Sequence, residues 1–255
     1  MGGRRPCDHP FIGHESGTKE SDALTPRRLP KDRMGFLIAL EGVDGSGKTT
    51  QARRLAEALR KAGWDVVLTR EPGGTPLGEQ LRRILLQSPV PPATGPAPRT
   101  ELLLYLADRA QHLHEVIEPA LRSRQIVVSD RFIDSTLVYQ GIARGFGVEL
   151  LIEVHQKLGV LRWPDCTVLL DVDPRLGLQR KRRQAQAEGP AIPLAEWSRF
   201  EREDLSFHQV VAEGYRQLAK MSPERWIVVP ADADPDTVFQ GIWTALRQKF
   251  PWLQP

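Results

Sequence analysis

A glycine-rich stretch carries the clearest chemistry in the sequence. Residues 42–49 read Gly42-Val43-Asp44-Gly45-Ser46-Gly47-Lys48-Thr49 and fit the pattern G-x-x-x-x-G-K-[ST] of a phosphate-binding loop, or P-loop. The glycines allow backbone N–H groups to turn toward phosphate oxygens, because no Cβ stands in the way. Lys48 can reach the β- and γ-phosphates of a nucleotide, and the Thr49 hydroxyl can hold Mg²⁺. These residues predict a nucleotide-binding site but do not identify the group that receives the phosphate.

Charged residues follow the next two apolar runs that have the length of strands. Arg70 follows residues 65–69, and the pair Asp130-Arg131 follows residues 125–129. Because ligands bind at the carboxyl ends of parallel strands, these side chains are expected to lie beside the P-loop. The arginines have a fork of donors that suits a second phosphate, and Asp130 can hold Mg²⁺. For Arg70, an ordinary surface arginine before a turn is an equally good interpretation.

Two side chains on a predicted helix could recognise a base. Tyr105 and Arg109 are four residues apart and therefore share one helix face. Together they could stack on a base and donate a hydrogen bond to its exocyclic oxygen. From the spacing alone, however, Tyr105 fits better as part of an apolar core stripe with Leu102 and Leu106.

A basic segment follows the fourth apolar run. The sequence Arg180-Lys181-Arg182-Arg183 ends a predicted helix, residues 184–198 have the composition of a loop, and Arg199 follows. Beside a P-loop, such a segment suggests a lid over about residues 180–203 that closes over ATP and excludes water. A solvated, arginine-rich helix end is the common alternative.

The elements that must position these residues alternate between strands and helices from Phe36 onward. Apolar runs predict five strands over residues 36–40, 65–69, 125–129, 167–170 and 225–229. Helices are predicted over residues 51–61, 76–87, 100–123, 134–144, 148–158 and 235–249. We expect Thr100 to cap the third helix and Pro119 to kink it. The pattern predicts a three-layer α/β domain of the P-loop NTPase type, with a five-stranded parallel sheet, helices on both faces and a lid.

Composition limits the classes of partner. The formal net charge is +3 in 255 residues, and residues 1–33 contribute +2 of it through seven Lys/Arg and five Asp/Glu. The remaining domain is therefore nearly neutral, and nucleic acid is not expected as a partner. No apolar run approaches the roughly 20 residues of a membrane span. The two cysteines, Cys7 and Cys166, have no metal-ligand spacing and suit a reducing, cytoplasmic location.

The first 33 residues differ from the rest of the chain. They are rich in Gly, Pro, Arg and Ser and show no apolar period. Residues 1–33 are therefore predicted to be a disordered tail, or else Met34 is the true start, which we slightly favour. Residues 34–255 are predicted to form the P-loop domain.

Four motifs together resemble the bacterial thymidylate kinase family, from about Phe36 to the C-terminus. They are Glu41-Gly42-Val43-Asp44-Gly45-Ser46-Gly47-Lys48-Thr49-Thr50, Thr69-Arg70-Glu71-Pro72-Gly73-Gly74, Asp130-Arg131-Phe132 and Ser135-Thr136-Leu137-Val138-Tyr139-Gln140-Gly141. The first is shared by many P-loop proteins, whereas the second and fourth are far more specific. The resemblance implies a nucleoside monophosphate kinase that transfers the γ-phosphoryl group of ATP to dTMP, giving ADP and dTDP with Mg²⁺. It also implies a homodimer.

The resemblance further implies roles for individual residues at the acceptor phosphate and sugar. Arg70 and Arg131 would hold the acceptor phosphate, and Asp44 would contact the deoxyribose 3′-hydroxyl. Tyr139 would crowd the 2′ position and so disfavour ribonucleotides.

Other residues are implied to recognise the base. Tyr105 would stack on thymine and Arg109 would donate to its O4 atom, which reverses the interpretation from spacing alone. Thr136 and Gln140 would face the edge of the base.

The catalytic charge is expected to come from the lid. Some family members carry a catalytic arginine inside the P-loop, whereas this chain has Asp44-Gly45-Ser46 there. Lys48 would act together with Arg182 or Arg183, with Arg199 as the next candidate, since catalysis depends on neutralising charge as the phosphoryl group moves. Arg180 is better suited to lie over adenine.

Other functions remain as alternatives. A deoxynucleoside kinase or another nucleoside monophosphate kinase is the nearest one. The former needs a carboxylate base near the acceptor hydroxyl, whereas a phosphate acceptor needs arginines. A GTPase-type switch is the alternative from another class. It should carry an Asn-Lys-x-Asp motif, and the sequence contains no asparagine.

Overall fold

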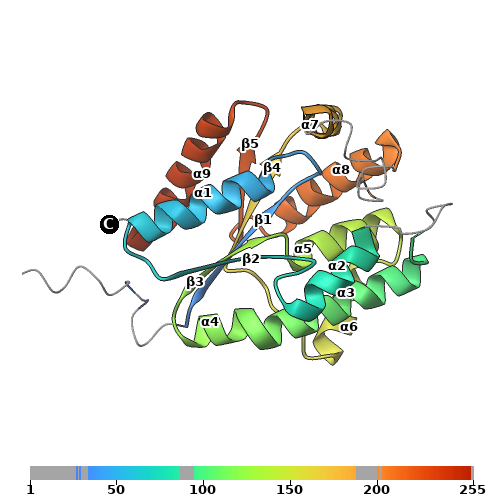
Figure 1. Cartoon of the computed structure of the whole chain (residues 1–255), viewed down its shortest axis with the longest axis horizontal. Helices are drawn as coiled ribbons and strands as arrows, with labels where there is room; N and C mark the ends of the chain where they lie inside the picture. The colour runs from blue at the N-terminus through green and yellow to red at the C-terminus, as the bar shows by residue number, and fades with distance from the viewer. Residues whose placement is uncertain are drawn as a thin grey trace, which may run out of the picture.

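The centre of the protein is a parallel sheet of five strands in the order β2-β3-β1-β4-β5 (Figure 1). The computed structural model describes residues 27, 29, 34–86, 95–187, 200 and 203–253. The strands are β1 (Phe36–Glu41), β2 (Val66–Arg70), β3 (Ile126–Asp130), β4 (Cys166–Asp171) and β5 (Trp226–Pro230). This sheet confirms the predicted fold class.

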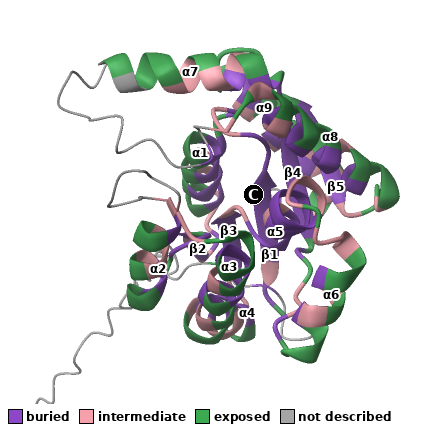
Figure 2. Ribbon diagram, turned by 90° about the vertical axis from the view of Figure 1, so that its right-hand side faces the viewer, coloured by how far each residue is buried: buried purple, intermediate pink, exposed green. Residues whose placement is uncertain are grey.

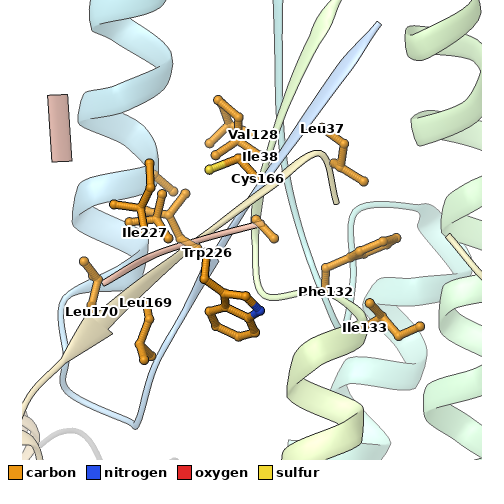
Figure 3. Close-up of a cluster of buried hydrophobic side chains, with 14 of the residues drawn as sticks. Leu37, Ile38, Val128, Phe132, Ile133, Cys166, Leu169, Leu170, Trp226 and Ile227 are labelled. Carbon is orange, nitrogen blue, oxygen red and sulfur yellow. The ribbon is translucent and has the colours of Figure 1, made fainter. Parts of the chain in front are cut away.

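The middle strand β1 is buried on both faces. Its residues from Leu37 to Leu40 have no exposed surface, as expected for an apolar strand of a parallel sheet between two helix layers. Ile38 lies opposite Val128 of β3 and Cys166 of β4. Figure 3 shows these three side chains gathered where the strands meet. The packing of these buried side chains therefore fixes the register of β1 relative to β3 and β4.

Helices cover both faces of the sheet (Figures 1 and 2). Helix α1 (Lys48–Lys61) packs beside α9 (Pro235–Lys249), which Asp234 caps by accepting from the backbone N–H groups of Asp236 and Thr237. Helix α8 (Leu205–Met221) packs against β4 and β5, and α4 (Glu118–Arg122) packs against β3. Because parallel strands all end at one edge, the residues that follow them converge there.

Four strands of the sheet end on a charged residue at the edge where the site lies. Strands β1 to β4 each extend one residue further than predicted, so that their last residues are Glu41, Arg70, Asp130 and Asp171. Helix α1 likewise begins at Lys48, three residues before the predicted start. The predicted boundaries were wrong by these few residues because charged side chains do not fit the apolar pattern. The backbones of these residues nevertheless continue the strand or the helix.

The long helix predicted over residues 100–123 is divided into three parts. Helix α3 (Pro98–His112) and α4 are joined by a π-helical segment, Leu113–Ile117. The segment directly precedes the turn that contains Pro119, which has no N–H to continue the α-helical pattern. The expectation that Thr100 caps the helix is wrong, because the helix begins at Pro98, whose preset φ suits a first helical position.

The same π-helical geometry appears in the fourth motif, which runs from Ser135 to Gly141. The helix predicted over residues 134–144 consists of α5 (Ile133–Thr136) and a π-helical segment, Leu137–Ala143, and is followed by α6 (Val148–Lys157). Such segments occur often at functional sites. This one carries two of the side chains that the family resemblance assigns to dTMP binding, Tyr139 and Gln140.

The C-terminal part contains two departures from the predictions. Helix α7 (Pro174–Ala187) continues four residues into the stretch predicted as loop, and α8 was not predicted. The remaining helices are α2 (Pro76–Leu86) and a short 3₁₀ helix, Pro251–Leu253. Most of the predicted lid, residues 188–199 and 201–202, lies outside the described residues.

Two residues of the predicted disordered tail pack against the domain. Leu29 is only 2% exposed and belongs to the core, and the backbone N–H of Arg27 donates to the carbonyl of Gly63. The rest of residues 1–33 lies outside the described residues. None of the helices in the described ranges combines the length and apolar character that a membrane crossing requires.

Candidate active site

A cavity of about 420 Å³ opens at the carboxyl edge of β1, β2 and β3. It is bounded by the P-loop, the residues after β2 and β3, helix α3, the π-helical segment 137–143 and part of α7. Fourteen of the predicted site residues line it: Asp44, Gly45, Gly47, Lys48, Thr49, Arg70, Tyr105, Arg109, Asp130, Arg131, Thr136, Tyr139, Gln140 and Arg180. The fold therefore brings together residues of all four motifs with others from α3 and α7.

The P-loop has the backbone geometry that its glycines allow. Gly42, Gly45 and Gly47 all have positive φ angles. A Cβ on Gly45 would lie 2.0 Å from the carbonyl oxygen of Gly177 in α7, so the loop and this helix can meet only because both residues are glycines. The first turn of α7 is thus fixed against the nucleotide-binding loop.

Lys48 is held over the same loop. Its Nζ atom donates to the carbonyl oxygen of Val43 at 2.8 Å and approaches the Ser46 hydroxyl at 3.5 Å. Burial lowers the pKa of Lys48 to about 8, and the positive charge of Arg131 contributes to the fall. A phosphate placed on this ammonium would favour its charged form.

Arg131 connects the P-loop with the end of β3. Its Nη2 donates to Asp44 Oδ1 at 2.7 Å and to the Tyr139 hydroxyl at 3.3 Å, while Nη1 donates to Ser135 Oγ at 3.1 Å and to the Tyr215 hydroxyl at 3.2 Å. Its backbone has a φ of 71°, a conformation that non-glycine residues seldom adopt. Such strain is found where surrounding contacts hold a functional residue in place.

Glu41 holds two of the side chains that contact Arg131, namely Ser135 and Tyr215. The carboxylate is completely buried and accepts hydrogen bonds from the Phe132 N–H at 2.8 Å, Ser135 Oγ at 2.6 Å and the Tyr215 hydroxyl at 2.8 Å. Burial raises the pKa of Glu41 to about 7, and the neighbouring Asp134 contributes to the rise. Sequence reasoning gave Glu41 no role, although an acidic residue that ends a buried apolar strand was an available signal.

Two further arginines border the cavity near β2. Arg70 forms a two-pronged ion pair with Glu79 of α2, with Nη2 at 3.0 and 2.9 Å from the two carboxylate oxygens. Arg82, also from α2, donates to the carbonyl oxygen of Pro72 at 2.9 Å and lines the cavity. Sequence reasoning missed Arg82, because only its position on α2 could have shown that it faces the same space as Arg70.

Arg109 also lines the cavity and is 1% exposed. Its Nε and Nη2 donate to Glu71 Oε2 at 3.0 and 2.5 Å, and its Nη1 donates to Thr136 Oγ1 at 3.0 Å and His155 Nε2 at 2.8 Å. These contacts engage four of its five N–H groups, which leaves one on Nη2 for a ligand. Arg109 therefore also has a structural role, which the family resemblance did not imply.

Glu71 and His155 fix the orientation of this guanidinium. Although burial would raise the pKa of Glu71, the charge of Arg109 and the contacts of His112 outweigh it and hold the pKa below its ordinary value. His155 Nδ1 lies 2.6 Å from the carbonyl oxygen of Leu151 and donates to it, so that Nε2 is the acceptor for Arg109. Burial, assisted by the charge of Arg109, lowers the pKa of His155 to about 4.

Thr49 and Asp130 provide the oxygen donors that Mg²⁺ prefers. The Thr49 hydroxyl donates to Asp130 Oδ2 at 2.5 Å, at the cavity wall. Within the described ranges, no group of three or more His, Cys, Asp or Glu side chains could hold a metal ion by itself. The pair fits a Mg²⁺ ion that takes its remaining ligands from water and nucleotide phosphates.

The basic residues of α7 differ in their surroundings. Arg180 donates to the carbonyl oxygens of Ala231 at 2.6 Å and Asp232 at 2.8 Å, just after β5. Lys181, which sequence reasoning gave no role, lines the cavity, whereas the exposed Arg182 and Arg183 do not. Arg199 lies outside the described residues.

We predict that His155→Gln reduces the loss of stability in mild acid. The folded protein keeps His155 neutral down to about pH 4, whereas the unfolded chain binds a proton there below about pH 6.5. The free energy of unfolding therefore falls as the pH drops through this window, and glutamine removes that contribution while still offering an acceptor to Arg109. Urea unfolding at about pH 7 and about pH 5 measures the difference.

His114→Gln serves as the control, because His114 is an exposed histidine on the π-helical segment that follows α3. The control should lose as much stability as the wild type between the two pH values. An equally large loss for His155→Gln would contradict the assignment of a neutral, buried imidazole.

Comparisons with known proteins agree with this geometry. A family model described as thymidylate kinase matches residues 40–242. The thymidylate kinase of Solidesulfovibrio magneticus is 49% identical over 208 residues, covering 82% of this chain and 97% of that protein. That of Maridesulfovibrio salexigens is 45% identical over 207 residues, covering 81% and 93%. The crystal structure of thymidylate kinase from Ehrlichia chaffeensis superposes with a TM-score of 0.65 at 32% identity, covering 84% of this chain and 99% of that one. The chain therefore belongs to the thymidylate kinase family.

Proposed function

We propose that the protein transfers the γ-phosphoryl group of ATP to dTMP, producing ADP and dTDP with Mg²⁺. The observation that carries this proposal is the position of Arg131, held between Asp44 of the P-loop and the end of β3 with Arg70 and Arg82 on the same cavity. A P-loop binds the phosphates of a donor, and a second group of arginines suits an acceptor that is itself a phosphate.

The donor end is formed by the P-loop and the start of α1. Backbone N–H groups of residues 42–49 and the Lys48 ammonium would surround the β- and γ-phosphates. Thr49 and Asp130 would hold Mg²⁺, which when bound neutralises charge on these phosphates. Arg180, tied to the backbone after β5, suits a position over adenine.

The acceptor end would hold the phosphate and the sugar of dTMP. Arg70 can exchange its exposed partner Glu79 for the phosphate, and Arg131 lines the same cavity. Although burial would raise the pKa of Asp44, Arg131 and Lys48 hold it below its ordinary value. An ionised Asp44 can accept a hydrogen bond from the 3′-hydroxyl, and the nearby Tyr139 ring would crowd a 2′-hydroxyl.

The base would lie between Tyr105 and the polar groups around Arg109. Burial raises the pKa of Tyr105, so the ring stays neutral and suits stacking on thymine. The remaining Nη2 hydrogen of Arg109 can bind the O4 atom. Thr136 accepts from Arg109, which leaves its own hydroxyl hydrogen for the base edge.

The phosphoryl transfer itself needs charge neutralisation and alignment more than covalent chemistry. Lys48 would follow the transferred group, and an arginine of the lid would complete the site when it closes. Arg182 and Arg183 near the end of α7 remain the first candidates, and Arg199 the next. The glycine contact between Gly45 and Gly177 supports a fixed base from which the far end of α7 can move.

We also propose a homodimer that works in the cytoplasm, where ATP and nucleoside monophosphates are present. Three large apolar side chains on the adjoining helices α2 and α3 support a helix-packed interface: Leu77, Ile84 and Leu103 are 45%, 51% and 64% exposed. A monomeric mass from light scattering of the purified protein would overturn the dimer, and recovery outside the cytoplasmic fraction would overturn the location.

Steady-state assays with dTMP and thymidine test the proposed reaction. With ATP and Mg²⁺ we expect dTMP to be converted to dTDP with a kcat/KM at least about a hundredfold above that for thymidine, because only dTMP offers a phosphate to the arginines. Chelation of Mg²⁺ should abolish turnover. Faster phosphorylation of thymidine would indicate a deoxynucleoside kinase, and tighter binding of GTP than ATP would favour a GTPase-type switch.

Alanine substitutions of Arg182, Arg183 and Arg199, one at a time, test the source of the catalytic charge. We expect at least one of them to lower kcat by about a hundredfold or more while the KM values for both substrates change little, since the charge is needed in the transition state. Arg175→Ala is the matched control, because Arg175 is an exposed arginine of the same helix. If all three variants keep the wild-type kcat, the lid does not supply the charge.

A further inference from the structure

We propose that Glu101 is a positioning residue that decides which end of the Gln140 amide faces the base, and that it thereby selects 4-keto over 4-amino pyrimidines. This inference rests on the proposed function and adds a residue to its base-recognition site. Glu101 belongs to the first turn of α3, and Gln140 belongs to the π-helical segment 137–143.

The two side chains meet in a buried hydrogen bond. Gln140 Nε2 lies 2.6 Å from Glu101 Oε1, and the residues are 1% and 0% exposed. Arg144 Nη2 donates to Glu203 Oε1 at 2.6 Å and also lies 3.8 Å from Glu101 Oε2, so a positive charge stands beside the Glu101 carboxylate. The contact is therefore charge-assisted and shielded from water.

The chemistry of the pair allows one orientation of the amide. A carboxylate only accepts hydrogen bonds, so it attracts the NH₂ group of Gln140 and repels the carbonyl oxygen. The Oε1 atom must then occupy the other branch of the amide. Gln140 lines the cavity, and with Nε2 held by Glu101 the Oε1 branch is the one that a ligand there would meet. Glu101 thus presents an acceptor to the base-binding end of the site.

An acceptor at this place distinguishes the two kinds of pyrimidine. Uracil and thymine carry an N–H at ring position 3 and an oxygen at position 4, whereas cytosine carries a bare nitrogen and an amino group. Gln140 Oε1 would accept from the first N–H and would face the lone pair of cytosine. The Arg109 donor and this acceptor would then face ring positions 4 and 3 in the order that a 4-keto base needs.

The substitution Glu101→Gln tests the proposal. The amide that it introduces can donate as well as accept, so Gln140 is no longer held in one orientation. We expect the ratio of kcat/KM for dUMP to that for dCMP to fall about tenfold or more, because these nucleotides differ only at ring positions 3 and 4. The KM for ATP should not change. A purely structural role would lower activity on both nucleotides and leave their ratio as it was.

A double-mutant cycle shows whether Glu101 acts through Gln140. Gln140→Leu should lower the same ratio, and adding Glu101→Gln to it should cause no further fall. Glu149→Gln, which changes an exposed carboxylate of α6, is the matched control and should keep the wild-type ratio. Should Glu101→Gln fail to fold, Glu101→Asp keeps the charge but withdraws the carboxylate by one methylene, and we expect an intermediate ratio.

An unchanged ratio in a folded Glu101 variant overturns the inference, as does a further fall in the double variant. A wild type that phosphorylates neither dTMP nor dUMP would instead overturn the proposed function, and the inference with it. The two failures are therefore distinguishable.

Discussion

The buried Glu41 carboxylate is the interaction on which the acceptor end of the site depends. It ends the central strand and accepts hydrogen bonds from Phe132 after β3, from Ser135 of α5 and from Tyr215 of α8. Ser135 and Tyr215 both also accept from Arg131. One carboxylate therefore joins the sheet, α5 and α8, and it sets where the Arg131 guanidinium points. Removing one partner of such a buried charged network typically costs about 3–5 kcal/mol, since the others are left unsatisfied.

The site is built in two halves that meet at Asp44. The P-loop half is local in sequence, because a strand, a glycine-rich loop and a helix follow one another directly. The half that we propose for the acceptor joins distant segments: Arg109 of α3 is held by Glu71 after β2 and His155 of α6. Asp44 belongs to the first half and pairs with Arg131 of the second at 2.7 Å. This ion pair fixes the position of the donor half relative to the acceptor half, as the alignment needed for phosphoryl transfer requires.

The fold and the place of the P-loop at the cavity could be predicted well from the sequence, because both depend on local patterns. Arg70, Asp130 and Arg131 could be found from their positions after strands, since parallel strands end at one edge. The partners of Arg109 could not, because Glu71, Thr136 and His155 are 27 to 46 residues away and meet it only in the folded chain. The π-helical segments were missed because each is a short segment within an otherwise helical run, so that the run still resembles one helix in the sequence. The roles of the individual site residues stay predictions, as do Arg199 and most of the lid.

The central claim is that the guanidinium group of Arg131, positioned through Glu41, binds the acceptor phosphate. Calorimetric titration of dTMP and thymidine into the wild type and Glu41→Gln tests it most directly. We predict that the affinity advantage of dTMP over thymidine shrinks about tenfold or more in the variant, while thymidine binding changes less, because Arg131 would contact the phosphate directly and the sugar only through Asp44 and Tyr139. An undiminished advantage in a folded Glu41→Gln protein would contradict the account.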